Sequence, residues 1–195
     1  METRAIWPAG DLEIRRTGKR PRIKGSFPYK ALAVIADRGK VRKERIMPGA
    51  FSFTLDDAKR EVNLLFGHSF DKPLASRSAG SLTLADTPEA LTFEAEIAPE
   101  LENVGHVRDA LAMLESGLVT GISPGLRVPP KDVVPGAETL VPEPGNPGVF
   151  IRQLGALLLF ELSLVTRPAY EAAQAELRAL QHAAQPPRQE RIWLP

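Results

Sequence analysis

Ser123 lies between two glycines in residues 121–125, which read GISPG. This segment matches G-x-S-x-G, the nucleophile elbow of α/β-hydrolases, in which a strand turns sharply at the serine and continues as a helix. Here the following residues read LRVPPKDVVPG, and their prolines exclude a helix. The acid and the histidine of that fold also follow the serine, whereas only His182 follows Ser123. The motif therefore indicates that Ser123 is a candidate nucleophile, whereas the residues around it argue against the α/β-hydrolase fold. An esterase of that fold is kept as an alternative function.

A serine nucleophile needs a base, and the base needs a group that orients it. His68 is the natural base, since it ends the apolar run LLFGH. Glu161 interrupts the apolar run LLLFELSLV, where a carboxylate is costly unless it is paired, and a buried imidazole would pair it. Each residue also has a structural interpretation: Ser123 as a turn former, His68 as a structural histidine, and Glu161 as an exposed residue on an edge strand. His106 is expected at the surface or on a helix flank.

Composition excludes several other kinds of chemistry. The chain has 195 residues, no Cys and three His, so thiolate catalysis, disulfides and multi-His metal sites are not expected. It carries no cofactor motif, and we predict no cofactor and no metal. The longest apolar run, residues 154–160, is too short to span a membrane, and the N-terminus is charged where a signal peptide is apolar. We therefore expect a soluble, cytoplasmic protein without a membrane partner.

Positive charge gathers near the N-terminus. Residues 1–48 hold 13 Lys/Arg and 5 Asp/Glu, a balance of +8 in a chain whose net charge is +1. Nucleic-acid binding is an alternative function for this segment, but stacking aromatics are not interleaved with the basic residues. Nucleic acid is thus not the expected partner. Residues 1–20 are expected to form a flexible basic arm.

Hydrophobic periodicity predicts short strands and few helices. Residues 81–86 and 91–98 alternate and should form a hairpin, whereas apolar residues between 101 and 118 recur at helical spacing and end at Gly117. We expect further strands, a long loop at residues 129–148, and a C-terminal helix at residues 169–184. This order favours a mainly antiparallel β fold with flanking helices, built as one domain of residues 21–180 and followed by a flexible tail, 181–195. The other strands are expected at residues 11–16, 31–36, 61–68 and 118–123, and one or two more at residues 149–166. A Gly/Pro/Lys-rich turn should separate the first two of these strands. Residues 50–55 should be either extended or in a short helix.

Four blocks in order resemble the prohead proteases that mature HK97-like capsids of tailed phages. They are ERIMPGAFSFTL (44–55), the His68 block (62–97), ESGLVTGISPGLRV (115–128) and LFELSLVTRPAYEAA (159–173). The sequence departs from the family pattern at GHS, where NHD is usual, and at Leu126, where Phe is usual.

This resemblance implies a serine endopeptidase with a fold similar to herpesvirus assemblin, a mostly antiparallel β-barrel flanked by helices. By position, Ser123 corresponds to the nucleophile, His68 to the general base and Glu161 to an acidic position, although related viral proteases place a second His there. Backbone N–H groups in a Gly-rich turn after Ser123 would bind the oxyanion. Because Pro124 has no N–H, Gly125 and the residues beyond it, or Arg127 or Arg167, would contribute. A non-catalytic capsid-assembly module with the same fold is the alternative.

The resemblance also implies where such an enzyme works and on what. It would act inside the assembling procapsid, in the cytoplasm of the bacterial host. Its substrates would be scaffolding sequence or the N-terminal extension of the major capsid protein, and then the protease itself. Residues 129–148 and the tail are the candidate sites of self-cleavage. A phage, a prophage or a gene transfer agent would be a suitable source, and a homodimer is an expected assembly.

Overall fold

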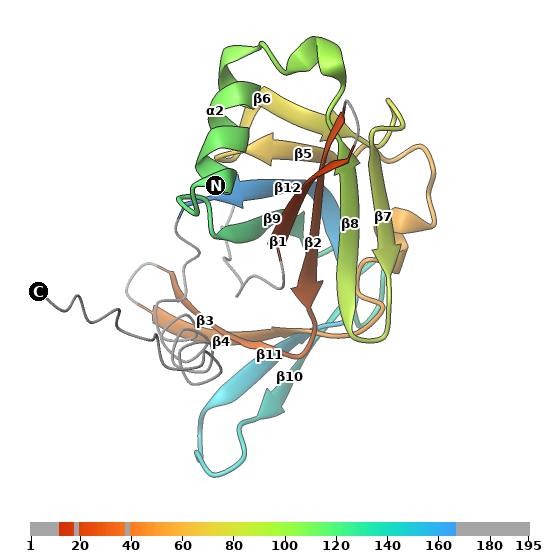
Figure 1. Cartoon of the computed structure of the whole chain (residues 1–195). Coiled ribbons are helices and arrows are strands. Elements are labelled where there is room, and N and C mark those ends of the chain that lie inside the picture. The colour runs from red at the N-terminus through yellow and green to blue at the C-terminus, as the bar shows by residue number, and fades with distance from the viewer. Residues whose placement is uncertain (1–11, 18–19, 38–39, 167–195) are drawn as a thin grey trace, which may run out of the picture.

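The computed structural model describes residues 12–17, 20–37 and 40–166 of the chain, and about half of that length is β-strand, with few helices (Figure 1). The predicted C-terminal helix (169–184), the tail, Arg167 and most of the basic arm lie outside the described residues. The division of the chain into arm, domain and tail stays a prediction. The strands are β1 Leu12–Thr17, β2 Arg20–Pro28, β3 Leu32–Asp37, β4 Lys40–Ile46, β5 Asn63–Phe66, β6 Ser69–Ser76, β7 Leu82–Asp86, β8 Ala90–Glu96, β9 Gly121–Arg127, β10 Glu138–Pro142, β11 Phe150–Leu154 and β12 Leu158–Val165. The helices are α1 Ser52–Leu55, a 3-10 turn η1 Pro99–Leu101, and α2 Gly105–Glu115.

The described strands form three four-stranded sheets, with the orders β1-β2-β8-β7, β10-β11-β4-β3 and β6-β5-β12-β9. Most pairings are antiparallel, as expected, but β12 runs parallel to β5 and β11 runs parallel to β4. The mainly β fold is therefore confirmed. The expected barrel is not found, because these strands make three sheets and no closed ring within the described residues.

The main core lies where the sheet β1-β2-β8-β7 faces the sheet β6-β5-β12-β9. Alternation along β8 places Leu91, Phe93 and Ala95 in this core, as the sequence predicts. From β12, Leu159, Leu162 and Leu164 enter the same core. The opposite face of β12 lies away from this core.

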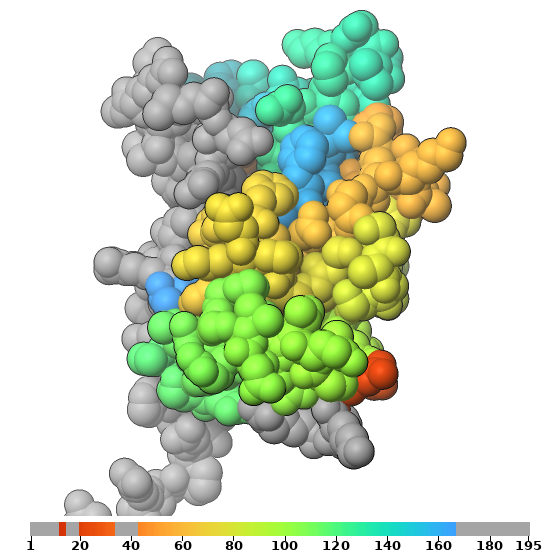
Figure 2. Space-filling model, turned by 90° about the horizontal axis from the view of Figure 1, so that it is seen from above, coloured from red at the N-terminus to blue at the C-terminus, as the bar shows by residue number. Residues whose placement is uncertain are grey.

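Helix α2 packs on β5 and β6, and Figure 2 shows the helix beside this hairpin on the face seen from above. Its inner side is apolar and includes Val107, Leu111 and Leu114. The helix ends at the predicted glycine: Gly117 has φ +71°, and Leu118 N donates to Met113 O (2.8 Å) in a Schellman arrangement. The predicted helix is confirmed, although it begins at Gly105 rather than near residue 101.

Several strands were not predicted from the sequence. The Gly/Pro/Lys-rich stretch before residue 31, interpreted as a turn, is the nine-residue strand β2. Strands β4 and β6 are rich in charged or polar residues and give no clear apolar alternation. The predicted loop at residues 129–148 is wrong in part, because β10 lies within it and pairs with β11.

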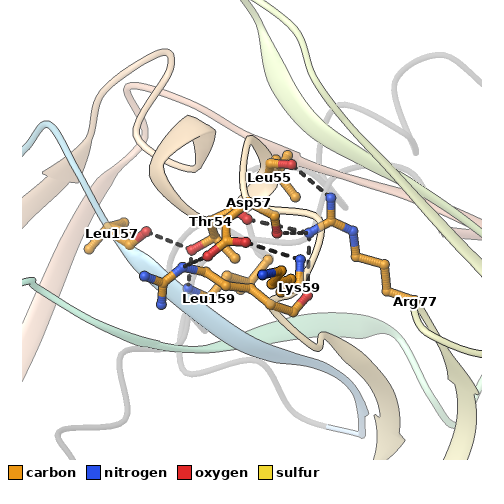
Figure 3. A network of polar contacts seen from close by, with 8 residues as sticks. Thr54, Leu55, Asp57, Lys59, Arg77, Leu157 and Leu159 are labelled. Carbon is orange, nitrogen blue, oxygen red and sulfur yellow. Dashed lines mark hydrogen bonds and ion pairs between the residues drawn. The ribbon is translucent and has the colours of Figure 1, made fainter.

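A polar network holds the start of β12 against α1 (Figure 3). Buried Thr54 donates through Oγ1 to Leu157 O (3.0 Å) and accepts from Leu159 N (2.9 Å). Arg77 directly follows β6. Its guanidinium donates to four backbone carbonyls, those of Thr54, Leu55, Asp57 and Arg60. Carbonyls at the end of α1 lack intrahelical partners, and Arg77 supplies donors for them.

Candidate active site

Ser123 lies in the middle of the extended strand β9 and has no exposed surface. The strand continues to Arg127 without the sharp turn and helix of a nucleophile elbow. The α/β-hydrolase alternative is therefore wrong, and so is the interpretation of Ser123 as a turn former. The G-x-S-x-G match arises because glycines flank a serine within a strand.

A β-bulge in β12 determines which side chains face Ser123. Against β9, Leu159 pairs with Leu126 and Glu161 pairs with Gly125, so Phe160 is an extra residue. Two residues of β12 thus oppose one residue of β9, so residues two apart in the sequence across the bulge lie on opposite faces. Leu159 therefore lies in the core, while Glu161 and Ser163 lie on the other face, with Ser163 directly opposite Ser123.

His68 is carried by the two-residue turn of the β5–β6 hairpin. Gly67 and His68 have φ of +66° and +59°, the signature of a type I′ turn, between the paired residues Phe66 and Ser69. The apolar strand ends at Phe66, two residues earlier than the sequence suggested. Because β5 runs parallel to β12 beside it, the hairpin places His68 near the end of β12.

His68 and Glu161 are in direct contact. The distance from His68 Nδ1 to Glu161 Oε1 is 2.7 Å, and both side chains are largely buried, 12% and 6% exposed. With Glu161 ionised, this contact makes Nδ1 the protonated nitrogen and directs Nε2 away from the carboxylate. The interpretation of Glu161 as an exposed edge residue is wrong, because a buried imidazole pairs it.

Ser163 was not singled out from the sequence, yet it contacts both of these residues. Its hydroxyl donates to Glu161 Oε2 (2.6 Å) and accepts from the backbone N–H of His68 (3.0 Å). Ser163 has no exposed surface. The signal was present in ELS, because residues two apart on a strand share a face and Ser163 therefore follows Glu161 on one face.

The two facing serines differ in their hydrogen bonding. Ser163 uses its hydroxyl as donor and as acceptor, whereas Ser123 Oγ is buried and has no hydrogen-bond partner among the described residues. His68 Nε2 is likewise buried and without a partner in that part of the chain. Buried polar atoms are nearly always paired, so two unpaired atoms at one site call for an explanation, and a reactive role is one. Contacts between a nucleophile and its base are often long before substrate binds.

The two predicted oxyanion residues have other contacts in the structure. Gly125 lies opposite Glu161, and a Cβ added to it would be 2.8 Å from Glu161 Cγ, so the glycine makes room for the carboxylate. Arg127 lies over the ring of Phe160, with its guanidinium carbon 5.8 Å from the ring centroid. The expected Gly-rich turn after Ser123 is absent, since these residues are in β9. Oxyanion binding by Gly125 and Arg127 stays a prediction.

The remaining candidates lie away from this cluster. His106, in the first turn of α2, contacts the carbonyl of Pro73 through Nε2 (2.9 Å), as a helix-flank residue would. Among the described residues, no group of three or more His, Asp or Glu could hold a metal ion. No helix in the described ranges is long and apolar enough to cross a membrane.

A serine opposite a buried histidine–carboxylate pair is the constellation of a serine hydrolase on a β framework. Comparison with protein families agrees with this class and makes it specific. Residues 33–186 match the family model described as caudovirus prohead serine protease. This match spans well over half of the chain, and the chain therefore belongs to that family. It is a serine protease of capsid maturation. No curated protein and no solved structure gives a significant match.

Proposed function

We propose that Ser123, His68 and Glu161 form the catalytic triad of this protease. The observation that carries the proposal is the hydrogen bond of His68 Nδ1 to Glu161 beside two buried atoms, His68 Nε2 and Ser123 Oγ, that have no partner within the described residues. Both atoms are the ones that would exchange a proton during acyl transfer. Ser163, directly opposite Ser123, is the competing hydroxyl, and its two hydrogen bonds make it unsuited to the role.

The reaction would proceed by two acyl transfers. Ser123 Oγ attacks the carbonyl carbon of the scissile peptide bond while its proton passes to His68 Nε2. The tetrahedral intermediate collapses as Nε2 returns this proton to the leaving amine. Water then attacks the acyl-enzyme with the help of the same nitrogen. Glu161 keeps the proton on Nδ1 and stabilises the imidazolium that forms in each step.

The oxyanion would be bound by N–H groups or by a cation near Ser123. Pro124 has no N–H, so the predicted donors are Gly125 and Arg127, with Arg167 as a third. The Glu161 carboxylate lies against the Cα of Gly125, and a second negative charge on that side would be unfavourable. Arg127 follows Gly125 by two residues on the same face of β9. Of these two candidates, we therefore favour Arg127 over Gly125 as the group that binds the oxyanion.

The substrates would be the N-terminal extension of the major capsid protein or scaffolding sequence, cut inside the procapsid in the host cytoplasm. Membership of the prohead protease family supports this assignment. Self-cleavage would fall in an accessible segment. Residues 144–148, between β10 and β11, are exposed, and they lie in the Pro-rich stretch 129–148 that is one of the two candidate segments for self-cleavage. The likeness to the herpesvirus assemblin fold belongs to the same proposal.

Ser123 and Ser163 have no exposed surface, and only 4% of Glu161 is exposed. A peptide carbonyl cannot reach Ser123 Oγ in this arrangement. Cleavage therefore requires a movement that opens the site.

The deciding experiment is co-expression with the capsid protein encoded beside this chain, wild type next to Ser123→Ala, measured by intact mass. We expect capsid protein shortened by one defined N-terminal piece with the wild type only. Shortening by both would refute Ser123 as nucleophile. Shortening by neither, together with no reaction of either with a fluorophosphonate, would favour a non-catalytic assembly module.

A further inference from the structure

The carboxylate of Glu161 is held at both of its oxygens. Oε1 accepts from His68 Nδ1, and Oε2 accepts from the Ser163 hydroxyl. The hydrogen bond to Oε2 is short, 2.6 Å, as expected for a hydroxyl that donates to a charged oxygen. Within the described part of the chain, the Ser163 hydroxyl is the donor that this second oxygen depends on.

The direction of the Ser163 hydroxyl is fixed by His68. The backbone N–H of His68 can only donate, so it occupies a lone pair of Ser163 Oγ (3.0 Å) and leaves the hydroxyl proton for Glu161. This N–H belongs to a residue at φ +59°, a conformation that non-glycine residues seldom adopt. One hydroxyl thus contacts the backbone of the proposed base and the side chain that orients its ring.

We infer that Ser163 is a positioning residue of this protease: it fixes both the Glu161 carboxylate and the His68 turn, and it acts on the reaction only through them. This inference rests on the proposed triad. The role of Ser163 thus differs from that of Ser123, the proposed nucleophile. It also differs from that of Thr54, a buried hydroxyl outside the site, which joins backbone segments at the start of β12.

The matched variants are Ser163→Ala and Thr54→Val. Each removes a fully buried hydroxyl that makes two hydrogen bonds to the protein, and both hydroxyls contact β12 or belong to it. Both variants should unfold at a lower temperature than wild type. At a temperature where all are folded, Ser163→Ala should lower kcat on the capsid substrate by roughly 10- to 100-fold with little change in KM. Thr54→Val should leave both constants near wild type. Equal kinetic losses in the two variants would overturn the inference.

A double-mutant cycle tests whether Ser163 acts through Glu161. In a Glu161→Ala background, Ser163→Ala should cost a clearly smaller factor than in the wild type, because the carboxylate is already gone and only the contact with the His68 turn remains to be lost. A loss of the same factor in both backgrounds would show that Ser163 acts independently of Glu161, and would refute the inference.

A spectroscopic measurement separates this inference from the proposed function. The chain has three histidines, so the His68 Nδ1–H proton can be assigned by NMR from single substitutions. Its exchange with water should be slow in wild type and Thr54→Val, and at least about 10-fold faster in Ser163→Ala. Unchanged exchange in Ser163→Ala would overturn the positioning role. Failure of the triad itself would instead appear as a wild type that neither cleaves capsid protein nor reacts at Ser123.

Discussion

The carboxylate of Glu161 packs directly against Gly125 on the neighbouring strand, in the space that a Cβ at position 125 would fill. The Cβ would lie 2.8 Å from Glu161 Cγ and 2.9 Å from Cδ, closer than real Cβ atoms approach. Glycine in the middle of a strand is normally unfavourable, and its presence here marks a close approach. The second glycine of GISPG is thus explained by the acid rather than by a turn.

Gly125→Ala should displace Glu161 from His68 and reduce activity while the sheet persists. The carboxylate cannot retreat without losing its bonds to His68 and Ser163, so we expect kcat to fall by at least about 10-fold. Cleavage of capsid protein and circular dichroism together measure this. Gly80→Ala provides a control for adding a Cβ, since no atom lies within 4 Å of that position, although its φ of +71° adds strain. Full activity of Gly125→Ala would contradict the packing argument.

Glu161→Gln should lower kcat roughly 10⁴-fold, by comparison with the equivalent change in a Ser-His-Asp triad. The amide has nearly the same shape, but it can present an N–H to Nδ1 and so favour the wrong tautomer of His68. Steady-state kinetics on the capsid substrate measure the effect, and thermal unfolding checks that the variant is folded. A loss below about 3-fold would remove Glu161 from the triad.

The two facing serines should respond differently to a fluorophosphonate. Ser123→Ala should abolish covalent labelling, because Ser123 Oγ, unlike Ser163 Oγ, has no hydrogen-bond partner in the part of the chain that the structure describes. Ser163→Ala should still be labelled, at a reduced rate, on the peptide that contains residue 123. Mass spectrometry of proteolytic fragments locates the adduct. An adduct on Ser163 in the wild type would reverse the assignment of the two serines.

Stability at low pH should depend on the ion pair between Glu143 and Lys43. Lys43 Nζ contacts both carboxylate oxygens at 2.6 Å, and this hydrogen bond lowers the pKa of Glu143 below its ordinary value of 4.5. A lowered folded-state pKa gives stability that is present above the unfolded value and is lost as pH falls through the folded value. The wild type should therefore be more stable than Glu143→Gln near pH 7, and the difference should shrink below about pH 4.

Thermal unfolding of both proteins across this range measures the effect of Glu143. Glu89→Gln, at an exposed position of the β7–β8 turn, is the control and should follow the wild type at every pH. A gap between wild type and Glu143→Gln that is constant with pH would contradict the electrostatic origin.

The fold was predictable where side chains alternate and the face toward the core is apolar. Strands β7 and β8 and helix α2 have this pattern, and all three form as expected. Strand β2 was missed because Pro21, Gly25 and Pro28 resemble turn residues. These residues are tolerated because β2 is held between β1 and β8, so tertiary pairing outweighs local preference.

The candidate site was predictable only as residue types. A carboxylate within an apolar strand must be paired, and that argument alone selects Glu161 and a histidine from the sequence. Ser163 escaped notice because its importance depends on the face of β12, and the bulge at Phe160 shifts that face by one residue. Periodicity alone cannot locate an inserted residue.

The bulge at Phe160 makes the reactive face of β12 depend on one residue staying out of the strand pairing. Leu159 and Glu161 are neighbours in the ladder although they are two apart in the sequence, so they lie on opposite faces. If Phe160 instead took the place opposite Gly125, Glu161 and Ser163 would turn toward the core and Leu162 would lie opposite Ser123. Sequences of this kind should therefore be aligned with room for one inserted residue just before the glutamate.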